Sequence, residues 1–243
     1  MLIEVFLAVI QAATEFLPVS SSGHLALFSN LLSEPDLFFF TALHFASLLA
    51  ILIFTRHELI GLMTFDKRYS KLWIYLIIGT IPAGLIGFFF KDLIEKSLGS
   101  YLFLGIAFIF TGIILLVTKN LSGKEKLTWK NALFIGLMQI FALFPGISRS
   151  GMTISAGMFS GISKEKSAKF SFLLFIPLAL GAMLIELGDF YFDFTLMIAF
   201  IVTFVLSLFF LNLLYVIIKK GYFWMFGFYC FFIGLVSLGL HFW

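Results

Sequence analysis

The chain is poor in charged residues and almost free of cysteine. Asp, Glu, Lys and Arg make up 12% of its 243 residues, about half of the share found in ordinary soluble domains. The single cysteine, Cys230, excludes an intrachain disulfide, a CxxC redox site and a cysteine-rich zinc site. No Lys or Arg precedes Arg56. The first apolar segment therefore lacks the basic start of a signal peptide, and we expect it to be retained.

Apolar residues take the place of the missing charges. They make up 61% of the chain, with 35 Phe and a mean hydropathy of +1.10. Apolar runs repeatedly reach the ~20 residues that an α-helix needs to cross a bilayer, whereas the short alternating segments of a β-barrel are not found. The net charge of +3 comes from short basic clusters rather than one basic face, so it is no evidence for nucleic acid, and we expect no such partner. The sequence predicts an all-α polytopic membrane protein with a single domain, residues 1–243.

Six apolar segments are each long enough to span the bilayer with some tilt: 37–55, 72–90, 100–118, 170–187, 195–218 and 222–242. Two further apolar regions, 1–32 and 131–162, are interrupted by polar, Gly and Pro residues, which leaves pieces too short to span alone. We expect these two regions to form re-entrant helical hairpins. Glycines within the spans allow close helix packing, either within the chain or in a homodimer.

The basic residues predict the orientation, because Lys and Arg accumulate in cytoplasmic loops. Most of them lie in four clusters: Arg56, Lys67, Arg68 and Lys71; Lys119, Lys124, Lys126 and Lys130; Lys164, Lys166 and Lys169; and Lys219 and Lys220. All four clusters fall on one side if 131–162 enters and leaves from the cytoplasm and 1–32 from outside. This predicts a multi-pass protein of the plasma membrane with both termini extracytoplasmic.

The two broken regions resemble each other. A shift of 128 residues superimposes Gln11 on Gln139, Ser20 on Ser148, Ser22 on Ser150 and Gly23 on Gly151. Because the two copies enter from opposite sides, we interpret them as an inverted-topology repeat whose broken helices meet near the midplane. A site built from both hairpins is the natural expectation.

The first break gathers polar side chains around a proline. Gln11 and Glu15 are four residues apart and share one helix face, and Pro18 ends that helix because it cannot continue the backbone hydrogen bonding. The serines that follow can cap the next helix. The polar residues from Glu15 onward are Glu15, Ser20, Ser21, Ser22 and His24.

The second break carries an arginine among hydroxyls. Pro145 and Gly146 predict a turn, and the next half-helix starts with the polar residues Ser148, Arg149, Ser150 and Thr153. Backbone N–H groups at a helix start and a guanidinium together form an anion site. An ionised side chain in an apolar segment costs at least ~2.5 kcal/mol, so we expect Arg149 to face Glu15. A structural ion pair would satisfy this expectation too, but the hydroxyls favour a functional site.

Other polar residues in the spans receive a structural interpretation. His44 and Asn212 lie within apolar runs, and we expect them to bond neighbouring helices rather than a substrate.

At the two breaks the sequence resembles the undecaprenyl-diphosphate phosphatase (BacA/UppP) family. The first family signature is (Glu/Gln)-x-x-x-Glu followed by Pro-x-Ser-Ser-x-Gly-His, which residues 11–24 match, and the second is Pro-Gly-x-Ser-Arg-Ser-x-x-Thr, which residues 145–153 match. The resemblance implies a hydrolase that converts a C55 polyprenyl diphosphate to the monophosphate, recycling the lipid carrier of cell-wall synthesis and conferring bacitracin resistance.

The resemblance also implies roles for individual residues. Glu15 is expected to be an essential acid, Arg149 to bind phosphate, and Ser21 and His24 to take part in phosphoryl transfer. Ser20, Ser22, Ser148, Ser150 and Thr153 are expected to bind the substrate phosphates. A divalent cation, Mg²⁺ or Ca²⁺, is expected at Glu15 and Gln11. However, Gln11 replaces the first glutamate of many members, which removes one negative ligand and puts a two-carboxylate metal site in doubt.

Two mechanisms and one other function stay open at the level of sequence. Ser21 either attacks the phosphorus or positions a water molecule. The partner is expected to be a polyprenyl diphosphate lipid, held in an outward-opening site beside a cleft between Phe-rich helices. A type 2 phosphatidic acid phosphatase is excluded because Ser155, not a histidine, follows Arg149 at the required spacing. A polyprenyl-phosphate transporter or flippase is the alternative, since inverted repeats are common in transporters.

Overall fold

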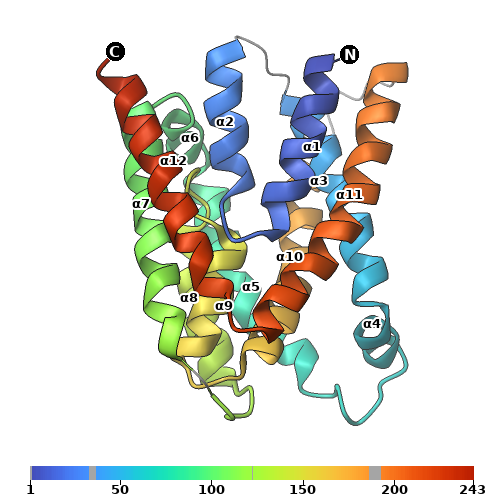
Figure 1. Ribbon diagram of the computed structural model, residues 1–243. Coiled ribbons are helices and arrows are strands. Elements are labelled where there is room, and N and C mark those ends of the chain that lie inside the picture. Colours follow the sequence, from blue (N-terminus) through green and yellow to red (C-terminus); the bar gives the residue numbers. More distant parts are fainter. Residues whose placement is uncertain (1, 33–36, 122, 186–192) are drawn as a thin grey trace.

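The computed structural model describes residues 2–32, 37–121, 123–185 and 193–243. Within these ranges the chain forms a bundle of α-helices that run between two ends of the molecule (Figure 1). The helices in chain order are α1 (Leu2–Phe16), α2 (Ser21–Leu32), α3 (Leu37–Phe54), α4 (Arg56–Met63), α5 (Leu72–Phe89), α6 (Lys91–Ser97), α7 (Tyr101–Val117), α8 (Trp129–Phe141), α9 (Arg149–Phe159), α10 (Lys164–Ile185), α11 (Phe194–Lys219) and α12 (Phe226–His241), with short 3₁₀ turns η1 (Thr118–Asn120) and η3 (Phe223–Met225).

Five of these helices, α5, α7, α10, α11 and α12, are long and apolar enough to cross a membrane. The sixth predicted crossing is α3, which forms with α4 a broken span that is bent by 74°. The prediction of an all-α polytopic membrane protein is therefore confirmed. The end of the predicted span 170–187 lies partly outside the described residues, because the described part of α10 ends at Ile185.

The two interrupted regions form pairs of short helices. α1 and α2 contain 15 and 12 residues, and α8 and α9 contain 13 and 11, all short for a bilayer crossing. In Figure 1 α1 and α2 occupy the half of the bundle in which both chain ends lie, and α8 and α9 lie mainly in the other half. The predicted hairpins are confirmed as broken helix pairs, and their relation by an inverted repeat stays a prediction.

Glycines bring α7 and α12 into close contact along their length. A Cβ atom at Gly112 would lie 2.9 Å from the carbonyl oxygen of Gly227, and one at Gly234 would lie 2.9 Å from that of Gly105. Glycine fits this spacing because it has no Cβ atom, as in other small-residue contacts between membrane helices. These glycines therefore serve packing within the chain.

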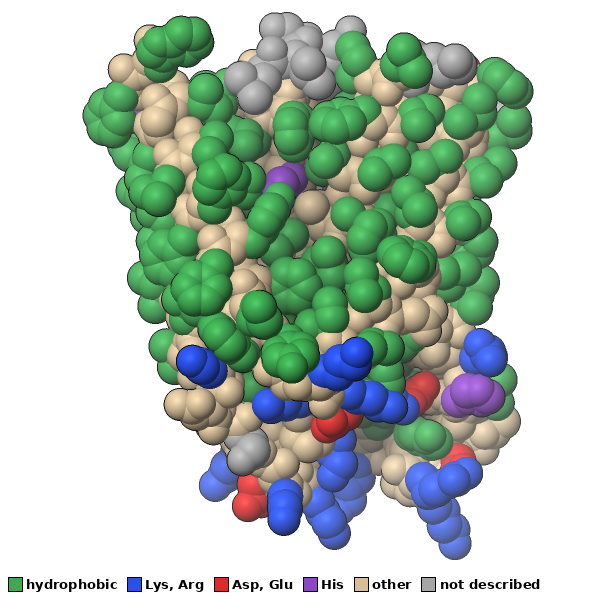
Figure 2. Space-filling model, in the orientation of Figure 1, with side chains coloured by type: hydrophobic (Ala, Val, Ile, Leu, Met, Phe, Trp, Pro, Cys, Tyr) green, Lys and Arg blue, Asp and Glu red, His purple; other side chains and the backbone are tan. Residues whose placement is uncertain are grey.

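The charged residues are separated from the apolar surface. Figure 2 shows hydrophobic side chains over the upper and middle parts of one face, and Lys and Arg gathered at the lower end. The four basic clusters flank the ends of α4, α5, α8, α10 and α11 that meet at this end in Figure 1. They therefore share one end of the bundle, as predicted.

An apolar cavity of about 270 Å³ lies between α4, α5 and α10. Mainly Leu and Ile side chains line it, together with Met63, Trp73, Thr80 and Pro177. None of the residues that line this cavity is a phenylalanine, and the predicted cleft between Phe-rich helices stays a prediction. Close by, Glu58 on α4 pairs with Lys169 on α10 at 2.5 Å, which holds the bent helix against the bundle.

Candidate active site

The first helix break is a tight turn that turns its hydroxyls inward. α1 ends at Phe16 and α2 begins at Ser21. Between them Ser20 has a φ of 69°, in the left-handed region that non-glycine residues seldom occupy. The Ser20 hydroxyl accepts a hydrogen bond from the backbone N–H of Gly23 at 3.3 Å, as an N-cap residue does. The prediction that the serines cap the helix after this break, α2, is therefore confirmed for Ser20.

The second break is fixed by a threonine from a neighbouring helix. Ser148 caps α9 by accepting from the Gly151 N–H at 3.1 Å. Thr111 on α7 donates its hydroxyl to the carbonyl of Gly146 at 3.0 Å and accepts from the N–H of Ser148 at 3.2 Å. Gly146 itself has a φ of 89°, which a glycine adopts without steric cost.

The two breaks touch each other. The Ser20 hydroxyl also accepts from the N–H of Gly146, at 3.1 Å. A Cβ atom on Gly23 would lie 2.6 Å from the Cα atom of Gly146, so Gly23 must be glycine for the two backbones to approach this closely. The predicted meeting of the two hairpins is confirmed by these contacts.

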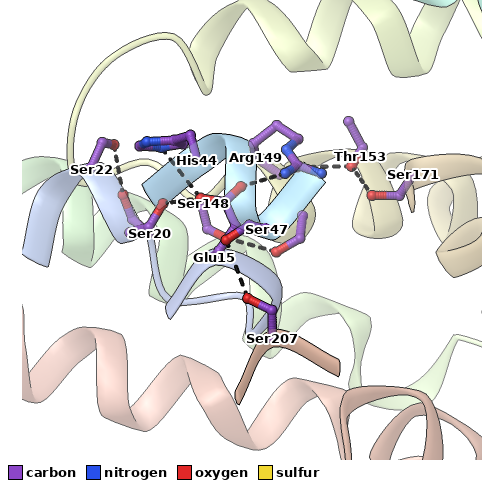
Figure 3. A network of polar contacts seen from close by, with 12 residues as sticks. Glu15, Ser20, Ser22, His44, Ser47, Ser148, Arg149, Thr153, Ser171 and Ser207 are labelled. Atoms are coloured by element: carbon purple, nitrogen blue, oxygen red, sulfur yellow. Dashed lines mark hydrogen bonds and ion pairs between the residues drawn. The ribbon is translucent and has the colours of Figure 1, made fainter. Parts of the chain in front are cut away.

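Glu15 is the centre of the polar network that results (Figure 3). Its Oε1 accepts from Arg149 Nη2 at 2.6 Å. Its Oε2 accepts from the Ser21 hydroxyl at 2.6 Å and from Gln11 Nε2 at 3.0 Å. The predicted pairing of Glu15 with Arg149 is therefore confirmed, and the carboxylate is also bound to the predicted reactive serine.

The guanidinium of Arg149 has one nitrogen, Nη1, without a hydrogen-bond partner among the described residues. Its guanidinium lies over the ring of Phe175 at 4.0 Å, a favourable cation–π contact. Nη2 binds Glu15, whereas Nη1 is buried without a hydrogen-bond partner among the described residues. An unsatisfied, buried guanidinium N–H costs free energy, and a phosphate oxygen is the acceptor that its fork geometry suits.

The remaining predicted hydroxyls lie around these two residues. Thr153 donates to the backbone carbonyl of Arg149 at 2.8 Å and lies 2.6 Å from the hydroxyl of Ser171. The hydroxyls of Ser148 and Ser150 are 3.3 Å apart, and those of Ser20 and Ser22 are 3.5 Å apart. The sequence interpretation missed Ser171, which lies in the long apolar run of α10 without any local motif.

His24 lies beside this network rather than in it. Its Nδ1 donates to the Ser20 carbonyl at 2.8 Å, so its Nε2 is free to accept from the Tyr229 hydroxyl, also at 2.8 Å. The ring stacks on that of Tyr229, with an interplanar angle of 10°. Among the described residues, no hydrogen bond or ion pair links His24 to Glu15 or Arg149. Tyr229 is a second residue that the sequence interpretation missed.

His44, in contrast, lies in the network, where it contacts Glu15 on the neighbouring helix α1, as expected; the expectation that it does not bond the substrate stays a prediction. Its Nε2 lies 3.5 Å from Glu15 Oε2. Asn212 departs from the expected bond to a neighbouring helix, since its amide donates to the Leu208 carbonyl of its own helix. From sequence alone the two could not be distinguished, because each is a single polar residue in an apolar span.

The predicted metal ligands are a poor fit to a protein-held Mg²⁺ or Ca²⁺. Gln11 turns its amide nitrogen towards Glu15, and its Oε1 is buried without a partner. Both oxygens of Glu15 already accept hydrogen bonds. No group of three or more His, Cys, Asp or Glu side chains among the described residues could hold a metal ion. These residues therefore offer one paired carboxylate and one neutral oxygen, fewer ligands than a dedicated cation cage needs.

Comparison with known proteins identifies the relatives of this chain. The family model described as "Bacitracin resistance protein BacA" matches residues 4–236. A protein of Methanococcus maripaludis named undecaprenyl-diphosphatase is 40% identical over 237 residues, which cover 94% of this chain and 95% of the relative. Proteins with corresponding names from Thermosipho africanus and Bacillus thuringiensis are 39% and 40% identical, over 96% of this chain and 97% and 94% of theirs. The chain belongs to the BacA family of bacitracin resistance proteins.

Proposed function

We propose that the protein hydrolyses undecaprenyl diphosphate to the monophosphate and inorganic phosphate. The observation that carries the proposal is the contact of one carboxylate, Glu15, with both an anion-binding arginine and a serine hydroxyl. Family membership and the names of the relatives support the same substrate. Such an enzyme recycles the lipid carrier for cell-wall synthesis and reduces sensitivity to bacitracin.

In this proposal Arg149 binds the terminal phosphate. Nη1 provides the free donor, and the N-terminus of α9 adds a positive end of a helix dipole. Ser20, Ser22, Ser148, Ser150 and Thr153 provide hydroxyls around the phosphate oxygens. Charge neutralisation of this kind is the main requirement of phosphoryl transfer.

Ser21 is the proposed nucleophile and Glu15 the base that activates it. Their 2.6 Å hydrogen bond supports transfer of the serine proton to Oε2 as Oγ attacks the terminal phosphorus. The bond from that phosphorus to the bridging oxygen breaks, and the lipid monophosphate leaves. Water then hydrolyses the phosphoserine, and Glu15 returns its proton to Ser21. If Ser21 only positions water, Glu15 would act as the base for that water instead.

His24 is the proposed acid or base on the leaving-group side. It would act at Nε2, the atom that faces the Tyr229 hydroxyl, so that Tyr229 controls its availability. Mg²⁺ or Ca²⁺ remains part of the proposal as an ion that the diphosphate brings with it, since diphosphate oxygens are strong ligands for both.

The lipid and the membrane set the remaining features of the proposal. The polyprenyl chain stays among the exposed apolar side chains of the bundle (Figure 2). The basic end is cytoplasmic by the positive-inside rule, both termini are extracytoplasmic, and the site opens outward. A homodimer is a further expectation from the glycine content, although the glycines of α7 and α12 are engaged within the chain.

Phosphate release from undecaprenyl or farnesyl diphosphate in detergent tests the reaction. The wild type should release phosphate, and Glu15→Gln, Ser21→Ala and Arg149→Ala should each lower the rate by roughly 100-fold or more, because each removes a group that acts in the transition state. Ser70→Ala, at an exposed loop position, is the matched control and should keep full activity.

The same assay separates the phosphatase from the flippase alternative. Detergent micelles have no two sides, so only a phosphatase gives a product in them. No release by a folded wild type with any divalent ion would reject the proposal, and lipid movement in vesicles would then support the transporter. A labelled phosphoserine that disappears in Ser21→Ala would establish covalent attack.

A further inference from the structure

His44 reaches the polar network from a third part of the chain. Glu15 comes from α1 and Arg149 from α9, whereas His44 lies in the middle of α3. Its Nε2 is 3.5 Å from Glu15 Oε2, the oxygen that also accepts from the Ser21 hydroxyl. Arg149 binds the other oxygen, Oε1. The carboxylate is therefore held from both ends.

The second ring nitrogen of His44 fixes the direction of the first. Nδ1 lies 2.8 Å from the carbonyl oxygen of Phe40, one helical turn earlier. A carbonyl oxygen only accepts, so Nδ1 carries a hydrogen in this contact. The other ring nitrogen, Nε2, is the atom that faces the Glu15 carboxylate. The backbone of α3 thus aims Nε2 at Oε2.

His44 is also more accessible than the two charged residues of this cluster. Its side chain is 35% exposed, compared with 5% for Glu15 and 14% for Arg149. A residue needed only for helix packing gains nothing from an open position beside a buried carboxylate. The position is suited to closing one side of the site while leaving access for a substrate.

We infer that His44 is a positioning residue for the proposed reaction, which holds Glu15 Oε2 in place against the Ser21 hydroxyl. It acts through Glu15 and therefore rests on the proposed function. His44 Nε2 and Ser21 Oγ share one acceptor oxygen, so displacement of that oxygen moves the base away from the serine proton. A misplacement of about 1 Å costs roughly 100-fold in rate.

Two substitutions separate a positioning role from simple packing. His44→Phe keeps an aromatic ring but removes both ring nitrogens, and we expect kcat to fall roughly 100-fold while KM stays within about threefold. His44→Gln restores an N–H donor and should return activity to within about tenfold of the wild type. His57→Phe, at an exposed position of α4, is the control and should have no effect. Equal losses in both variants, a change in KM alone, or full activity of His44→Phe would overturn the inference.

A measurement without substrate keeps the inference separate from the proposed function. Isotope-labelled histidine NMR of the wild type and of Glu15→Gln should show a changed Nε2 resonance for His44 and an unchanged one for His57. This result is expected even if the wild type hydrolyses no diphosphate, in which case only the proposed function fails. An unchanged His44 resonance would show that the two side chains do not interact, and would reject the inference whatever the activity.

Discussion

One carboxylate organises the polar side chains of the site. Glu15 binds Arg149 through one oxygen, and Ser21 and Gln11 through the other. Each of these contacts compensates a polar group that would otherwise be costly inside an apolar bundle. The cost of isolated charges is also the reason why the pairing of Glu15 with Arg149 could be predicted from the sequence.

The fork of Arg149 leads to the first prediction at this scale. Nη2 holds Glu15, whereas Nη1 has no hydrogen-bond partner among the described residues and is the donor that we propose for the substrate. A lysine has a single ammonium group for both tasks. We expect Arg149→Lys to lower kcat/KM roughly 100-fold although the charge is kept. Arg68→Lys, in an exposed loop, is the control. Activity close to that of the wild type in Arg149→Lys would show that Nη1 is not used.

The contact of Tyr229 with His24 gives a second prediction. Tyr229→Phe removes the hydroxyl that donates to His24 Nε2 but keeps the stacked ring. If His24 acts as acid or base, loss of this contact should change the pH profile of kcat. The free energy of unfolding should fall by about 1 kcal/mol, the net contribution of one hydrogen bond. An unchanged pH profile would limit His24 to supporting the backbone of Ser20.

At the scale of helices, the breaks were easier to predict than the packing. Proline and glycine interrupt regions 1–32 and 131–162, and these residues end helices for steric reasons that act locally. The contacts of His44, Ser171 and Tyr229 depend instead on the rotation of one helix against another. A single polar residue in an apolar span can contact any of several neighbouring helices, so the sequence alone leaves its partner undetermined.

The glycine contact between α7 and α12 predicts where the bundle is sensitive. A Cβ atom at Gly112 would lie 2.9 Å from the Gly227 carbonyl oxygen, whereas one at Gly84 meets nothing within 4 Å. Gly112→Ala should therefore destabilise the protein by about 1–3 kcal/mol, as overpacking does. Gly84→Ala should be neutral or stabilising, because alanine favours helices. Thermal unfolding in detergent measures both, and equal midpoints would contradict the close contact.

For the molecule as a whole, the distribution of charge predicts the topology. The basic loops share one end of the bundle, and the termini lie at the other (Figures 1 and 2). Cys230 is fully buried, so the wild type should resist thiol reagents and provides a clean background. In intact cells Trp243→Cys should react with an impermeant reagent, whereas Lys124→Cys should react only after lysis. The reverse pattern would invert the proposed orientation.

The contact between the two breaks also has a consequence for biosynthesis. Glu15 precedes Arg149 by 134 residues, so a growing chain inserts its acidic half-helix well before the partner that neutralises it exists. Until the second hairpin is made, the Gln11 amide, the Ser21 hydroxyl and His44 are the partners of Glu15 among the described residues. A nascent chain that stops before Gly146 would also lack the backbone that closes against Gly23. The first hairpin therefore lies in the membrane without its partner residues until more than half of the chain has been synthesised.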